Sequence, residues 1–155
     1  MANNSEQIDE YRSKINGAQG QKEGLQSELN ALERKLEEVK KDIMDYENSL
    51  DELNNAKSFL NSASYDLTDA VTDMDDYFQG NVADKTIDEY YDADDEISNI
   101  FQNVENLINE TEITVDELYK EKARLEEDIA DLKRRIASID STINSYNQSL
   151  NNLLN

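Results

Sequence analysis

The chain has 155 residues, a formal net charge of −21, and no Cys, His, Trp or Pro. Without Cys and His it lacks thiol chemistry, disulfides and the commonest protein ligands of zinc. Its strong negative charge repels the phosphates of nucleic acids and anionic lipids. We therefore expect no cofactor, no metal, no catalytic residues and no nucleic-acid partner, and we expect that the protein is not an enzyme.

The N-terminal segment, from Met1 to Gln7, lacks the charged and then apolar pattern of a signal peptide. No apolar run in the sequence approaches the roughly 18 residues that a membrane-spanning helix needs. We expect no membrane insertion, and any export would have to use a route that reads no cleaved signal.

A heptad pattern starts at Ile8 and continues without a shift to Phe78. The a positions follow Ile8 in steps of seven, the d positions follow Tyr11, and both are mostly apolar. Such sustained spacing is typical of a coiled coil. It predicts a first helical arm over about 6–78.

The pattern breaks at Gly80 and restarts with a positions counted from Ile87 and d positions counted from Ala83. Gly80 suits the position just past a helix end, and Asn81 suits the cap of the next helix. A link as short as 79–81 forces two helices to run antiparallel. The second arm is predicted over about 82–153.

The heptads of the two arms match each other. If Leu36 lies opposite Leu125 and Leu29 opposite Leu132, every a position of one arm faces a d position of the other. The predicted fold class is therefore all-α, a long antiparallel helical hairpin (coiled coil) that forms a single domain over 1–155.

Two segments are unfavourable as helix. The segment 110–114 is rich in β-branched residues, and Thr114 with Glu117 forms a capping box, so we expect the second arm to break or kink there. The glycines of the first arm each cost about 1 kcal/mol relative to Ala. Either the helix frays around them or they admit a close partner backbone. They are Gly17, Gly20 and Gly24.

Four seam positions carry a charged side chain. The lysines among them can extend their ammonium groups outward and help to set the register. Asp94, opposite Leu67, is too short to do so, and it marks either a hydrated seam or a recognition residue. The three lysines are Lys22, Lys57 and Lys122.

The half of the hairpin nearest the turn has a wider apolar face. Its g positions are apolar on both arms, whereas those of the other half are polar, and a two-helix hairpin has nothing to bury such a face against. We predict that it binds another helical hairpin, unless the second arm folds back near 110 and covers it. The predicted partner-binding residues are Ala56, Phe59, Ala63, Ala70, Tyr77, Tyr91, Ala93, Ile100 and Leu107.

Most of the charge lies in the same half. Residues 58–118 contain 17 acidic side chains and one basic side chain, Lys85. Such a surface attracts a basic partner. Two acidic runs, 73–76 and 92–96, resemble fragments of calcium loops but lack the Gly and terminal Glu of an EF-hand, so we interpret them as solvated charge.

The turn residues Phe78-Gln79-Gly80 resemble the Trp-x-Gly turn of the WXG (ESAT-like) helical hairpins of type VII secretion, with Phe in place of Trp. The whole layout resembles the longer YwqH-like proteins, which accompany LXG-domain toxins in Gram-positive bacteria. The turn motif is carried by Phe78 and Gly80.

This resemblance implies a non-enzymatic targeting partner that pairs with the LXG domain of a toxin or with another small helical hairpin. It implies a protein that is cytoplasmic before export. The family often carries an aromatic-x-x-x-Asp/Glu export element, a spacing that Tyr90 with Asp94 and Tyr91 with Asp95 both fit. The alternative function is a structural coiled-coil spacer that forms a homodimer through the same apolar face.

Overall fold

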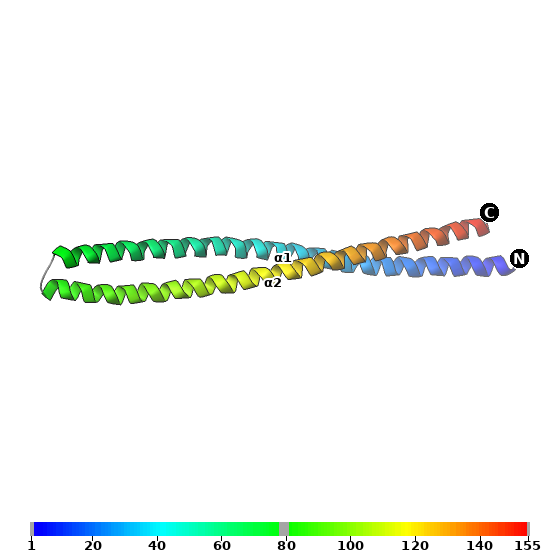
Figure 1. The fold of residues 1–155 in the computed structure, drawn as a ribbon. Helices are drawn as coiled ribbons and strands as arrows, with labels where there is room; N and C mark the ends of the chain where they lie inside the picture. Colours follow the sequence, from blue (N-terminus) through cyan, green and yellow to red (C-terminus); the bar gives the residue numbers. More distant parts are fainter. Residues whose placement is uncertain (1, 78–80, 155) are drawn as a thin grey trace. The chain divides into compact units, whose positions relative to one another are not determined.

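The protein folds as two long α-helices. The structure, a computed structural model, describes residues 2–77 and 81–154, and the side chains of 4–73 and 85–154. Helix α1 is Ala2–Tyr77 and helix α2 is Asn81–Leu154. The helices pack against each other and run in opposite directions (Figure 1), which confirms the predicted all-α helical hairpin.

The helix bounds lie close to those predicted. Helix α1 begins at Ala2, a few residues before the predicted start near residue 6, and α2 begins at Asn81. The predicted turn motif, Phe78 and Gly80, lies outside the described residues.

The chain divides into two compact units, each built from one segment of α1 and one of α2. Unit 1 comprises Met1–Lys41 and Tyr119–Asn155, and unit 2 comprises Asp42–Leu118. Both termini belong to unit 1 (Figure 1).

Unit 1 has a mostly apolar seam, which Lys22 and Lys122 interrupt. The eight buried apolar side chains among its described residues all occupy a or d positions, and Leu132 is the most buried at 3% exposed. Burying a Leu or Ile side chain contributes about 1.5–3 kcal/mol, so this seam is the main source of stability in unit 1. The eight residues are Ile15, Leu29, Leu36, Val39, Leu125, Ile129, Leu132 and Ile136.

Seam lysines agree with the predicted register. The Nζ atom of Lys22 lies 2.6 Å from Oδ1 of Asp140, which follows the residue that the register places opposite Lys22. In unit 2, Nζ of Lys57 lies 2.7 Å from Oε1 of Glu105, which likewise follows its register partner, Val104. Each lysine extends out of the seam to a carboxylate at its edge, as long amphipathic side chains do.

The predicted break at 110–114 is wrong. Helix α2 continues through this segment without interruption. The hydroxyl of Thr111 donates to the carbonyl of Leu107 at 2.7 Å, and that of Thr114 donates to Glu110 at 2.9 Å, so both are satisfied within the helix. Val115 is buried in the seam at 9% exposed, and this burial outweighs the few tenths of a kcal/mol by which β-branched residues disfavour helix. The second arm therefore does not fold back near 110.

The glycine segment is also helical. Helix α1 runs through Gly17, Gly20 and Gly24, so the fraying considered for this segment is not seen. A methyl group added to any of these glycines would meet no atom within 4 Å, because all three lie on the outer surface of unit 1.

Candidate functional site

Unit 2 has a less buried seam than unit 1. Its buried apolar side chains, among those described, are Ile43, Ile108 and Val115, which are 6–9% exposed. Between residues 44 and 107 the described seam side chains are at best half-buried, including Leu60 and Phe101. Two helices cover only one side of each seam residue, so this part of the molecule retains apolar surface that a further helix could bury.

Exposed large apolar side chains are concentrated in the same unit. Eight of the ten that the described residues present belong to unit 2. Single exposed apolar residues are ordinary, whereas a contiguous set marks an interaction site, and of these eight only Phe59, Ile100 and Leu107 lie together on one side of the seam. The eight are Met44, Tyr46, Phe59, Tyr65, Tyr91, Ile100, Leu107 and Ile113.

Six g positions of unit 2 form what we call the apolar flank, which lies along one side of the seam. In the register, Ala63 of α1 lies across this flank from Ile100 of α2. Ile100 and Leu107 are each 49% exposed, and Ala63 and Ala93 are half-buried. The members of the apolar flank are Ala56, Ala63, Ala70, Ala93, Ile100 and Leu107.

The same positions in unit 1 are polar. Nζ of Lys35 and Oε1 of Glu121, both at g positions, form an ion pair at 2.7 Å. The apolar character of this side of the seam is therefore confined to unit 2, as the sequence predicts.

Phe59 extends the apolar flank on its α1 side. It follows Ala56 by three residues and precedes Ala63 by four, so the three side chains lie on neighbouring positions of one helix face. Phe59 is 73% exposed. Tyr77, which was also predicted to bind the partner, is the last residue of α1, and its side chain lies outside those described.

Tyr91 is not part of this flank. It precedes Ala93 by two residues, a rotation of roughly 200° around the helix, which places it on the other side of the seam. Its ring packs edge-on against Tyr90, with centroids 5.4 Å apart, and the hydroxyl of Tyr90 lies 3.1 Å from Oγ1 of Thr68. Sequence reasoning grouped Tyr91 with the partner-binding residues because it used position along the chain, and the heptad position separates them.

Carboxylates line both outer edges of the apolar flank. They occupy c positions, the row next to g on each helix, and all are exposed. None of them is in an ion pair with another residue that the structure describes. We call this set the carboxylate rim: Asp45, Glu52, Asp66 and Asp73 on α1, and Glu89, Glu96 and Glu110 on α2.

Nearly all the net charge belongs to unit 2. Unit 2 contains 22 acidic and 2 basic residues, a net charge of −20, whereas unit 1 contains 14 acidic and 13 basic residues, a net charge of −1. The two basic residues of unit 2 are Lys57 and Lys85. Lys57 extends to Glu105 and lies 5.3 Å from the ring centre of Phe101, on the side of the seam away from the apolar flank.

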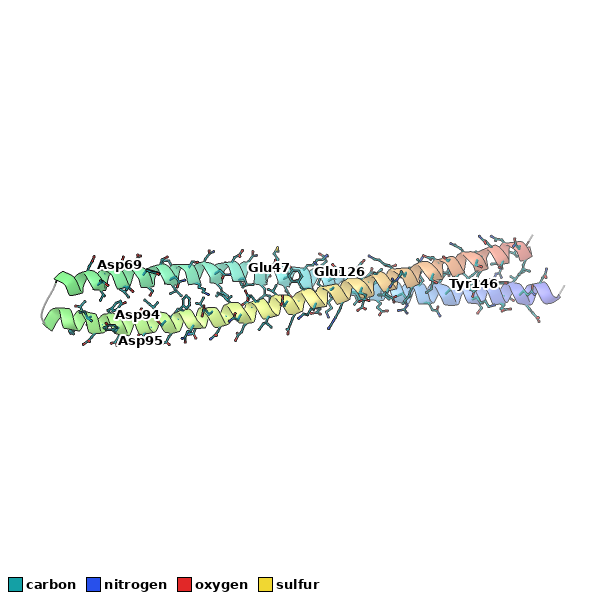
Figure 2. All side chains as sticks on the ribbon, in the orientation of Figure 1. Glu47, Asp69, Asp94, Asp95, Glu126 and Tyr146 are labelled. Carbon is teal, nitrogen blue, oxygen red and sulfur yellow. The ribbon has the colours of Figure 1, made fainter. Side chains whose placement is uncertain are left out.

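The two candidate export pairs differ in exposure. Tyr90 and Asp94 occupy seam positions and are half-buried. Tyr91 is 62% exposed. Asp95 is also exposed and lies on the side of α2 that faces away from α1 (Figure 2).

The described residues contain neither a candidate metal-binding group nor a candidate membrane-spanning helix. No three of their acidic side chains are grouped so that they could hold a metal ion. None of the described helical segments is apolar enough over a sufficient length to cross a membrane.

The pKa values of Lys14 and Lys40 are raised above the usual 10.5, chiefly by hydrogen bonds to Glu10 and Glu37 respectively.

Comparison with protein-family models, with curated proteins and with solved structures finds no match to this chain.

Proposed function

We propose that this protein is a non-enzymatic binding module that docks another helical protein on the apolar flank of unit 2. The observation that carries this proposal is the exposure of Ile100 and Leu107, both about half exposed, beside a seam that two helices leave half-buried. Covering these side chains with a third and fourth helix would complete a helical bundle.

The energetics favour a partner over a free surface. Burying a large apolar side chain contributes about 1.5–3 kcal/mol, and Phe59 is 73% exposed while Ile100 and Leu107 are each 49% exposed. Association costs roughly 4–15 kcal/mol, so the half-buried seam residues must contribute as well. A partner that covers the whole length of the apolar flank would also cover the half-buried seam residues beside it, and it would therefore bury this additional apolar surface.

The type of partner follows from the resemblance of the turn. Phe78-Gln79-Gly80 and the hairpin layout are similar to WXG-like and YwqH-like proteins. On that basis the partner is the LXG domain of a toxin or another small helical hairpin. The function is then to help deliver the toxin to a type VII secretion system of a Gram-positive bacterium. The exposed pair Tyr91 and Asp95 is the better candidate for an export element.

The test measures the mass of the complex. The chain is purified alone and together with a toxin LXG domain or a small WXG-like hairpin, and each sample is examined by sedimentation velocity. We expect a heteromer, which Ala63→Glu abolishes because a carboxylate then lies within the apolar flank. Ser62→Glu is the matched control, since it adds the same charge one residue away, on the outer face.

Two results would contradict the proposal. One is a tight homodimer that ignores every candidate partner, as expected of a structural coiled-coil spacer. The other is loss of helix content in Ala63→Glu, measured by circular dichroism, which would mean that the flank belongs to the chain's own core.

A further inference from the structure

The carboxylate rim and the alanines of α1 restrict what can occupy the apolar flank. We propose that the occupant is a basic amphipathic helix of another protein, which packs closely along α1, places large apolar side chains over the alanines, and pairs flanking Lys or Arg with the rim. A second copy of this chain is disfavoured by its charge. This inference rests on the proposed function and specifies the partner.

The shape of the flank favours close approach along α1. Its three α1 members are alanines spaced by seven residues, so they form a line of small side chains on one face: Ala56, Ala63 and Ala70. Helix axes lie about 8–10 Å apart depending on the side chains at the contact, and small residues give the shorter distance.

The α2 side of the apolar flank carries larger side chains than the α1 side. There Ile100 and Leu107 project beyond Ala93, and Phe59 stands at the outer edge of α1. A partner helix laid along the line of alanines, which we call the channel floor, would therefore have Phe59 on one side and Ile100 and Leu107 on the other. Its own large apolar residues fit over the floor, where Ala leaves room for them.

The negative charge of the carboxylate rim favours a partner whose contacting surface is positively charged. The seven rim carboxylates are exposed and make no ion pair with the described residues, and both edges of the flank carry the same charge. Exposed ion pairs contribute only about 0–1 kcal/mol each, so the rim acts mainly on partner choice and on the association rate.

A second copy has the wrong charge. Stacking two apolar flanks would bring two rims together in a unit that already carries a net charge of −20. Like charges opposed at an interface cost affinity, and this repulsion weakens as salt shortens the Debye length to about 10 Å at 0.1 M.

The experiment uses the full chain and two synthetic amphipathic peptides of about four heptads. Both peptides carry the same Leu stripe; one has Lys at the positions beside the stripe, and the other has Glu. Fluorescence anisotropy measures binding at low and at high salt. We expect the Lys peptide to bind at least tenfold more tightly at low salt, with a difference that shrinks as salt is added. Equal binding of the two peptides would overturn the charge requirement.

Three variants locate the binding. Ala63→Glu makes the chain more acidic, so purely electrostatic adhesion would strengthen, whereas docking on the flank should weaken at least tenfold. Ala63→Leu adds apolar surface but fills the channel floor, and it should also weaken binding at least tenfold. Ser62→Leu, on the outer face, should leave binding unchanged.

The outcomes separate this inference from the proposed function. If Ala63→Glu weakens binding and Ala63→Leu does not, the flank is a docking face but the close packing along α1 is refuted. If neither substitution weakens binding of the Lys peptide, the apolar flank is not the site, and both this inference and the proposed function are overturned.

Discussion

Nζ of Lys57 lies 2.7 Å from Oε1 of Glu105, although Lys57 occupies a seam position. The contact holds the only cation of this stretch of the seam on the side opposite the apolar flank. The six g positions of the apolar flank are Ala, Ile or Leu and carry no charge, so this contact keeps the ammonium group of Lys57 away from them. The division of unit 2 into a charged side and an apolar side depends in part on this ion pair.

Reversing the charge of Lys57 should destabilise unit 2. Lys57→Glu places a carboxylate beside Glu105 in a unit that is already strongly acidic, and since both side chains are partly exposed we expect a loss of about 1 kcal/mol or less in the free energy of unfolding. The double variant Lys57→Glu with Glu105→Lys restores the pair and should recover most of this loss. Urea unfolding followed by circular dichroism measures both; a double variant as unstable as the single one would argue against the pair.

Truncations in the two seams should differ in cost. Leu132 is 3% exposed in unit 1, and Leu132→Ala should lower the free energy of unfolding by about 2–4 kcal/mol. Leu60 is only half-buried in unit 2, so Leu60→Ala should cost roughly half as much. Thermal melts of the two variants test this contrast, and equal losses would show that the unit 2 seam is as well buried as that of unit 1.

Salt should stabilise unit 2 selectively. Its net charge of −20 produces self-repulsion that added salt screens, whereas unit 1 is almost neutral. Hydrogen exchange monitored by mass spectrometry should show faster exchange in 50–107 than in 121–136 at low salt, because fewer side chains are buried there. Raising the salt concentration should slow exchange in unit 2 and leave unit 1 unchanged. Uniform slowing of both units would contradict this interpretation.

Alkaline pH should remove a small stabilising contribution at Lys40. Its hydrogen bond to Oε1 of Glu37, at 2.8 Å, raises the pKa of Lys40 above 10.5. Because the folded-state pKa is the higher one, the contribution is fully present below pH 10.5 and is lost as the pH rises through the raised value. Lys40→Gln should therefore melt at a slightly lower temperature than the wild type at neutral pH, with the difference vanishing above that value. A difference that persists at alkaline pH would indicate a packing effect.

The sequence predicted the helices, their antiparallel register and the unit that carries the apolar flank, because a and d spacing reports directly on burial in a two-helix seam. The predicted break at 110–114 was wrong because helix propensity takes no account of tertiary burial. Val115 is buried in the seam, and the hydroxyls of Thr111 and Thr114 form hydrogen bonds within the helix.

Features that depend on position around the helix were harder to predict. Tyr91 was grouped with Ala93 because the two are close in sequence, although they lie on opposite sides of the seam. The carboxylate rim was seen only as a high density of acidic residues, since charge was counted along the chain. Assigning each acidic residue its heptad position would have revealed the two rows, for instance Glu89 and Glu96 on α2.

The most direct test of the central claim is the change in hydrogen exchange when the full chain binds a helical partner, either a toxin LXG domain or the Lys-flanked peptide. Docking on the apolar flank predicts slower exchange in 56–70 and 93–107, with no change in unit 1. Protection confined to unit 1, or bound partner without protection in these two segments, would contradict it.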